Sequence, residues 1–162
     1  MEIFIISTIK KKPSGYGQFG GFSPYGNVTA LAFFLATNAS GAVIDSDTTV
    51  AVASGDVIDL GELPEGMRLD DAQILIKTGM TATVTGSLGF KYVDGDSTEV
   101  PQDAAYFINA GDLATAGRLR ANTGKLVTLP KAARLILTTG GAANAKASDI
   151  KVIVSGELTG PR

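Results

Sequence analysis

Residues 81–92 read TATVTGSLGFKY, and small or apolar residues alternate with polar residues along this stretch. On an extended chain one face would carry the small and apolar side chains, namely Ala82, Val84, Gly86, Leu88, Phe90 and Tyr92. The other face would carry mainly hydroxyl groups and Lys91. Successive side chains of a strand point to opposite faces of its sheet. The stretch therefore predicts a β-strand with one buried face.

Turn signals bound this strand and its neighbours. Asp94-Gly95 follows directly and is typical of a tight turn. Leu63-Pro64-Glu65-Gly66 fits a type I turn, with Pro second and Gly fourth. Further candidate strands are 29–36, 48–53, 56–60, 72–78, 104–109, 125–129, 133–139 and 150–158.

The alanine-bearing stretches 110–117 and 141–147 are interrupted by Gly, Thr or Asn and predict loops, not helices. Short strands at spacings near ten residues are typical of a sandwich or jelly roll. We therefore expect an all-β chain with a single β-sandwich, jelly-roll-like domain over 29–162.

Composition excludes several functional classes. The 162 residues suffice for one core, with 44% apolar and 19% charged residues. A net charge of −2 argues against a general nucleic-acid binder. The chain contains neither Cys nor His, so it lacks the commonest general base and the usual transition-metal ligands. We expect no enzyme activity, no cofactor, no metal and no membrane span.

Paired carboxylates are the remaining candidates for chemistry. Asp70-Asp71 would point to opposite faces of a strand, which makes them a poor acid–base pair. Residues 94–99 superficially resemble a calcium loop but lack the full ligand series, so a hairpin turn is the better interpretation. Arg118 and Arg120 flank Leu119 and would point the same way on an extended segment, toward solvent or an acidic partner surface.

The N-terminal part differs from the rest. Residues 13–27 read PSGYGQFGGFSPYGN, a density of Gly and Pro that excludes a helix and disfavours a central strand. Tyr16, Phe19, Phe22 and Tyr25 recur every third residue, and a polyproline-like chain has three residues per turn. We expect residues 1–28 to form an extended arm ahead of the body.

Three interpretations of this arm compete: a flexible linker, a docking arm that inserts its rings into a partner, and a nucleic-acid stacking segment. Stacking segments interleave rings with Arg or Lys, and 13–27 contain neither. We favour the docking arm, whose expected contact residues are Phe4, Lys10, Lys11, Lys12, Tyr16, Phe19, Phe22 and Tyr25.

Four buried rings would contribute at most about 6–12 kcal/mol, whereas ordering the backbone would cost about 15–30 kcal/mol. Backbone pairing by residues 2–9 with a neighbour would have to assist, and we expect the arm to become ordered only in an assembly.

Five phrases resemble a known family: VASGDVIDLGELPEGMRLDDAQILIKTG at 52–79, GSLGFKYVDGD at 86–96, AAYFINAGDLATAGRLR at 104–120, ARLILTTGGAANA at 133–145 and IKVIVSGEL at 150–158. Together they resemble the capsid cement, or decoration, proteins of tailed phages.

The resemblance implies a jelly-roll-like body on the outside of the virion, made in the host cytoplasm, with an extended terminus that clamps copies of the major capsid protein. Because symmetric sites favour a symmetric oligomer, we also expect self-association as a homodimer or a homotrimer. A carbohydrate- or receptor-binding sandwich of a phage fibre or adhesin is the alternative. The body has no Trp and only Tyr92 and Tyr106 as possible sugar platforms, which disfavours this alternative.

Overall fold

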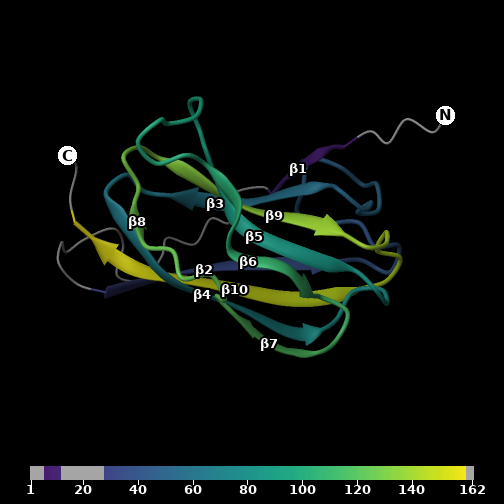
Figure 1. The fold of residues 1–162 in the computed structure, drawn as a ribbon. Helices are drawn as coiled ribbons and strands as arrows, with labels where there is room; N and C mark the ends of the chain where they lie inside the picture. The colour runs from purple at the N-terminus through teal and green to yellow at the C-terminus, as the bar shows by residue number, and fades with distance from the viewer. Residues whose placement is uncertain (1–5, 12–27, 160–162) are drawn as a thin grey trace.

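The structure, a computed structural model, describes residues 6–11 and 28–159 (Figure 1). Within these ranges the chain forms strands and no helix, which confirms the expected all-β class. The strands are β1 (Thr8–Lys10), β2 (Val28–Thr37), β3 (Val57–Leu63), β4 (Met67–Thr78), β5 (Thr85–Tyr92), β6 (Asp103–Asp112), β7 (Gly117–Arg120), β8 (Val127–Thr128), β9 (Ala133–Gly140) and β10 (Ser148–Leu158).

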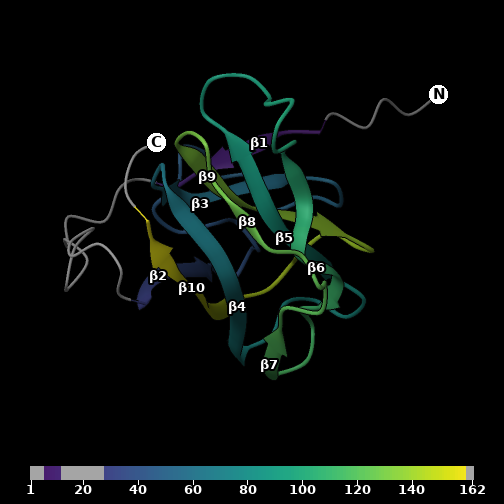
Figure 2. The same ribbon diagram turned by 60° about the vertical axis from the view of Figure 1, so that its left-hand side comes forward.

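The strands form two sheets that pack face to face (Figures 1 and 2). The first sheet has the order β1-β3-β9-β5-β6, and the second has the order β2-β10-β4-β7 with β8 beside β4. The antiparallel pairs are nested: β2 with β10, β3 with β9, β4 with β7 and β8, and β5 with β6. Each pair lies inside the previous pair along the sequence, and successive pairs alternate between the two sheets. This is the connectivity of a jelly-roll-like sandwich.

The core lies between the sheets and follows from strict alternation. In β10 every second residue from Ser148 to Leu158 is buried, and the residues between them are exposed or half-buried. The predicted alternation in 81–92 is observed from Gly86 onward, with Leu88, Phe90 and Tyr92 facing the core. One hydrophobic face per strand is enough to specify which side of each sheet is buried.

An aromatic cluster fills one part of the core. The rings of Phe90, Tyr92, Tyr106 and Phe107 contact one another edge to face, with centroid separations of 4.8–5.5 Å. The Tyr106 hydroxyl donates to the Leu69 carbonyl of the second sheet at 3.2 Å and accepts from the Val127 N–H at 3.0 Å. Tyr106 thus links the two sheets while its own polar atom stays bonded.

Loop backbones cause several differences from the sequence-based expectations. The expected strand over 81–92 begins only at Thr85, because Thr83 adopts a φ of 68° within a turn. Residues 48–53 form a single bridge from Ala51 to Ala42 instead of a strand. The hydrogen-bonded turn near Pro64 lies one residue later than predicted, from Pro64 to Met67, with Gly66 at a φ of 77°.

The β5–β6 pairing needs a glycine at one position. A Cβ on Gly89 would lie 2.0 Å from the Asp103 carbonyl oxygen, so no other residue fits there without moving β6. The register between β5 and β6 shifts twice near this crossing. Such bulges twist an edge strand and reduce its ability to pair with another chain.

Candidate functional site

The described part of the N-terminal segment, residues 6–11, lies against the body. β1 pairs in parallel with β3, placing Ile9 beside Ile58 and Lys10 beside Asp59. Ile9 is only 2% exposed and belongs to the same core cluster as Ile58. For these residues the backbone pairing is therefore made within the chain.

The β2–β3 connection holds β1 from its other side. The Asp47 N–H donates to the Lys10 carbonyl at 3.0 Å, and the Lys10 N–H donates to Asp47 Oδ1 at 3.1 Å. On the β3 side, Asp56 directly precedes β3, and its Oδ1 accepts both the N–H and the hydroxyl of Ser7, at 3.1 and 2.9 Å. Both sides of this short edge strand are thus bonded, which fixes where the N-terminal segment leaves the body.

Lys11 joins the end of this segment to β2. Its ammonium donates to the Phe34 carbonyl, and its backbone forms a bridge with Ser46. Burial lowers the pKa of Lys11, and the nearby Asp45 carboxylate opposes that shift. The Lys11 side chain therefore bonds the backbone carbonyl of Phe34 in β2, whereas the side chain of Lys10 is exposed.

The expected contact residues are divided between two regions. Lys10 and Lys11 lie in the anchored segment just described. Six others fall outside the described residues, namely Phe4, Lys12, Tyr16, Phe19, Phe22 and Tyr25.

Sequence reasoning missed Asp47 and Asp56 as anchors, because they lie 37 and 49 residues from their partners. It also missed the outward position of Phe34. A signal was present there, since the pair Phe33-Phe34 must place one ring on each face of a strand.

Phe34 is the aromatic side chain that faces solvent in the described part of the chain. It is 59% exposed, whereas the other five aromatic residues there are at most 8% exposed. Lys151 of β10 places its ammonium 5.4 Å from the centre of the Phe34 ring. Aromatic side chains, Phe among them, are enriched in protein–protein interfaces relative to the rest of the protein surface.

The carboxylate pairs carry structural bonds. Asp70 pairs with Arg68 at 2.7 Å, and Asp71 pairs with Arg120 at 2.6 Å. Arg118 and Arg120 point outward on β7 while Leu119 packs against the core, as their spacing predicts.

The loop between β5 and β6 is longer than a tight turn and is held by its own side chains. Asp96 Oδ1 accepts the N–H groups of Ser97 and Gln102, both at 2.8 Å, and these bonds lower the pKa of Asp96. The Lys131 ammonium donates to the carbonyls of Asp94 and Asp96 at 2.6 and 3.0 Å and lies 4.9 Å from the centre of the Tyr92 ring. A lysine thus occupies the place that a bound cation would take in a calcium loop.

A shallow open pocket of about 330 Å³ lies between this loop and β8. Its floor is formed by Phe90 and Tyr106, and its rim carries the ion pair of Lys125 with Asp103. Burial raises the pKa of Tyr106, and its hydroxyl is already bonded to Leu69 and Val127. These lining residues do not form a nucleophile with an adjacent base.

Two further features of the described residues bear on other functions. Within 6–11 and 28–159, no group of three or more acidic side chains is arranged to hold a metal ion. Over the same ranges, no helix has the length and apolar character needed to cross a membrane.

Comparisons with known proteins identify the fold. No protein-family model matches the sequence, and no curated protein matches it. A chain in the solved capsid of Ralstonia phage GP4 is similar, with a TM-score of 0.63 and 17% identity over 93% of this chain and 97% of that chain. A chain in the capsid asymmetric unit of cyanophage Pam1 is also similar, with a TM-score of 0.57 and 17% identity over 91% of this chain and 93% of that one. The sandwich is therefore shared almost end to end with chains found in phage capsids.

Proposed function

We propose that this chain is a structural protein of a tailed-phage virion. In this proposal it is a cement, or decoration, protein that binds the outside of the head and bridges copies of the major capsid protein through its N-terminal arm. The observation that carries the proposal is the fold shared over 93% of this chain with a chain from a phage capsid. The five sequence phrases that resemble capsid cement proteins support the same conclusion independently.

The anchored segment supports a fastening role for the arm. A bridging arm transmits load only if its root is fixed to the body. Here the root is held by β3 and Asp56 on one side and by Asp47 on the other, and Ile9 fills part of the core. Lys11 and Val28, the described residues on either side of 12–27, both pair with strands or bridges of the body.

Self-association as a dimer or trimer completes the proposal. A capsid offers symmetric sets of sites, and a symmetric oligomer touches several subunits at once. Each contact then raises the effective concentration of the next, so weak individual contacts give tight attachment.

The two tyrosines that the sugar-binding alternative would need as stacking surfaces are buried. Tyr92 and Tyr106 are 2% and 3% exposed, and both hydroxyls are bonded inside the protein. A carbohydrate platform needs an accessible ring face, which neither tyrosine offers.

The proposal is tested by co-sedimentation of the full chain with heads assembled from the major capsid protein of the phage that encodes it. Deleting residues 1–28 would be a poor test, because it removes Ile9 from the core. The better variant replaces Tyr16, Phe19, Phe22 and Tyr25 by Ser and leaves β1 and β2 intact. We expect the wild-type chain to bind heads and this variant to lose at least tenfold in affinity.

The matched control replaces four polar residues of the same segment by Ala, namely Ser14, Gln18, Ser23 and Asn27. It should bind like the wild type. Absence of wild-type binding to heads would refute the cement function, and equal binding by the two quadruple variants would refute the role of the rings.

A further inference from the structure

The outward face of the second sheet has a distinct composition. Pairing register places Phe34, Lys151, Leu75 and Arg118 in one row across β2, β10, β4 and β7. The next row places Ala32, Ile153, Gln73 and Arg120 side by side. Apolar side chains of β2, β10 and β4 therefore lie on this face beside the cations of β10 and β7.

Three of the five cations on this face take part in ion pairs, and two do not. Its four acids each pair with a cation of the same face: Asp70 and Glu157 with Arg68, Asp149 with Lys77, and Asp71 with Arg120.

Lys151 and Arg118 have no acidic partner within the described part of the chain. Lys151 contacts the Phe34 ring, and Arg118 donates to the neutral Gln73 amide at 2.9 Å. Both therefore remain available to pair with a carboxylate from outside the molecule.

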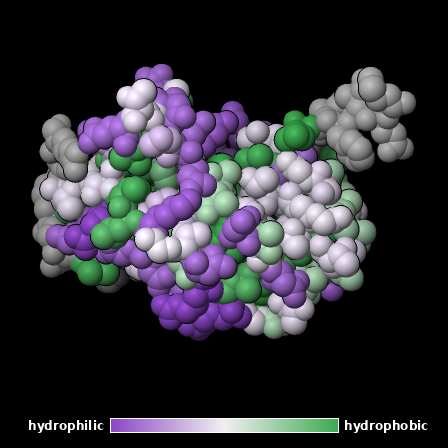
Figure 3. Space-filling view, in the orientation of Figure 1, coloured by the Kyte–Doolittle hydropathy of each residue, from purple (hydrophilic) through white to green (hydrophobic). Residues whose placement is uncertain are grey.

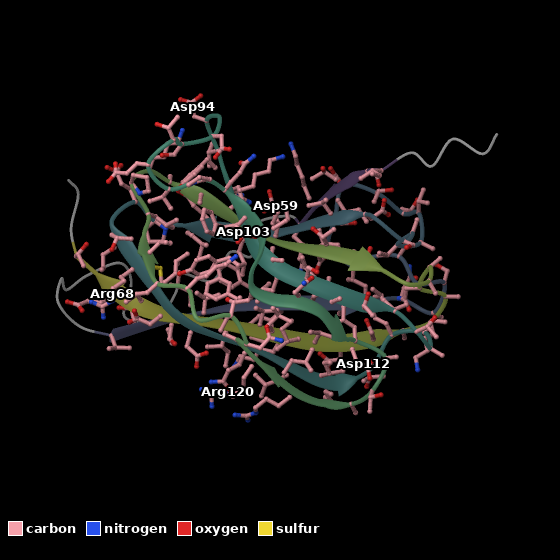
Figure 4. The ribbon with its side chains drawn as sticks, in the orientation of Figure 1. Asp59, Arg68, Asp94, Asp103, Asp112 and Arg120 are labelled. Carbon is pink, nitrogen blue, oxygen red and sulfur yellow. The ribbon has the colours of Figure 1, made fainter. Side chains whose placement is uncertain are left out.

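The rest of the described surface has the opposite charge balance. The outward face carries five cations and four anions, whereas the remaining described residues carry seven cations and eleven anions. In Figure 4, Arg120 lies at the second sheet and Asp94 lies at the tip of the β5–β6 loop on the far side of the molecule. Figure 3 shows hydrophilic residues both at the Arg120 side and at the upper, Asp94 side, because the hydropathy scale does not separate acids from bases. The outward face thus carries a small net positive charge, whereas the remaining described residues are net negative and include the Asp94 tip on the opposite side.

We propose that the outward face of the second sheet is the docking face of the body, and that its partner is a protein surface that is acidic around an apolar patch. This inference rests on the proposed function, because it names the side of the body that meets the capsid shell. Phe34 supplies the exposed aromatic anchor, and Lys151 and Arg118 supply the charges that choose an acidic partner.

Charge favours an acidic partner over a second copy of this chain. A two-fold contact would place this face against itself. Lys151 and Arg118 of one copy would then meet the same cations of the other copy, with all four acids already paired. Like charges opposed across an interface cost free energy, so copies of the chain should meet through other surfaces.

The size of the face fits a contact that works together with others. β2, β10, β4 and β7 contain 10, 11, 12 and 4 residues. With strands about 4.8 Å apart and a rise of about 3.3 Å per residue, they cover roughly 600 Å². A stable interface buries about 800 Å² on each partner. This face alone should therefore bind weakly, and the N-terminal arm would supply the remaining affinity.

The test uses the full chain and heads assembled from the major capsid protein of the same phage. The main variant is the double charge reversal K151E/R118E, and a second variant is Phe34→Ser. Both change exposed or half-buried outward side chains, so the fold should persist, which circular dichroism and thermal unfolding check. We expect K151E/R118E to lower the affinity for heads at least tenfold and Phe34→Ser at least fivefold, with less salt dependence in the double variant.

The matched control is K91E/K146E, which changes the net charge equally at two exposed lysines elsewhere. It should bind within about twofold of wild type. Equal losses in both double variants, or no loss in K151E/R118E, would overturn the docking face while leaving the cement function intact. Failure of wild type to bind would remove both. Sedimentation velocity of the free proteins adds one outcome: self-association lost in K151E/R118E would assign the face to a second copy instead.

Discussion

Asn144 shows how one buried side chain joins the loops at one end of the sandwich. Its Oδ1 accepts the Thr81 N–H at 3.0 Å, and its Nδ2 donates to Thr37 Oγ1 at 3.0 Å and to the Lys146 carbonyl at 2.9 Å. The residue is 1% exposed. The Asn144 amide therefore supplies the hydrogen bonds that water would otherwise make to polar groups of Thr37, Thr81 and Lys146.

Asn144→Ala should reduce the free energy of unfolding by about 2–3 kcal/mol, because it leaves several buried polar groups without partners. Urea unfolding followed by circular dichroism measures the change. The control Asn122→Ala alters an exposed residue and should cost less than about 0.5 kcal/mol. A small loss at Asn144 would mean that water replaces the amide.

Asp96 links loop order to pH. Hydrogen bonds from Gln102 and Ser97 hold the pKa of Asp96 below its usual value. A carboxyl whose pKa is lowered by folding stabilises the folded state at every pH above its ordinary pKa of about 4. This stabilisation is lost as the pH falls through the lowered pKa of the folded state. Asp96→Asn should therefore be less stable than wild type at pH 7, and the difference should shrink as the pH falls below the ordinary carboxyl pKa.

Unfolding measured across this pH range checks the Asp96 prediction. Asp94→Asn is the control, because no hydrogen bond to the Asp94 carboxylate is seen in the described residues. A stability difference for Asp96→Asn that stays constant with pH would contradict the assignment.

At the scale of single residues, only part of the candidate site was predictable. Lys10 and Lys11 stood out as charges after an apolar run. Asp47 and Asp56 did not, because their partners lie 37 and 49 residues away and the contact depends on the whole sandwich. The paired positions of Arg118 and Arg120 were predictable, because alternation along a strand is local.

At the scale of elements, β1 is the least expected strand. It has three residues, too few for a periodic signal, and its partner β3 begins at Val57. Longer strands such as β10 were predictable, because eleven residues show alternation clearly. The strand expected at 48–53 failed for a related reason: apolar residues were present, but Ser46 and Thr48 side chains bond to the local backbone and favour turns.

Ile9→Ala tests whether β1 is part of the folded body. Removing a buried Ile side chain typically costs 2–5 kcal/mol, and we expect about 2–3 kcal/mol here, since an edge strand relaxes more easily than a central one. Urea unfolding measures it, with Ile6→Ala as the control because Ile6 is 69% exposed. Equal, negligible losses in the two variants would show that this segment contributes nothing to the stability of the body.

At the scale of the whole molecule, nested pairing makes the fold strongly non-local. β2 pairs with β10 along ten positions, although they lie near opposite ends of the sequence. The fold class was predictable because alternation and turns recur along the chain. The strand order was not, because it depends on contacts between distant segments.

This topology predicts slow, cooperative folding. Closing long loops costs entropy before distant strands can pair, so refolding should take milliseconds to seconds, within the range of other β-sandwiches. Stopped-flow refolding from urea, followed by tyrosine fluorescence and circular dichroism, checks this expectation. A microsecond phase carrying most of the amplitude would contradict it, as would separate equilibrium transitions for the two sheets.

The ammonium of Lys131 has a consequence for the β5–β6 loop. The positive charge that holds the carbonyls of Asp94 and Asp96 is covalently attached to the chain and cannot diffuse away. Chelating agents and changes in the hardness of the surrounding water should therefore leave the shape of this tip unaltered.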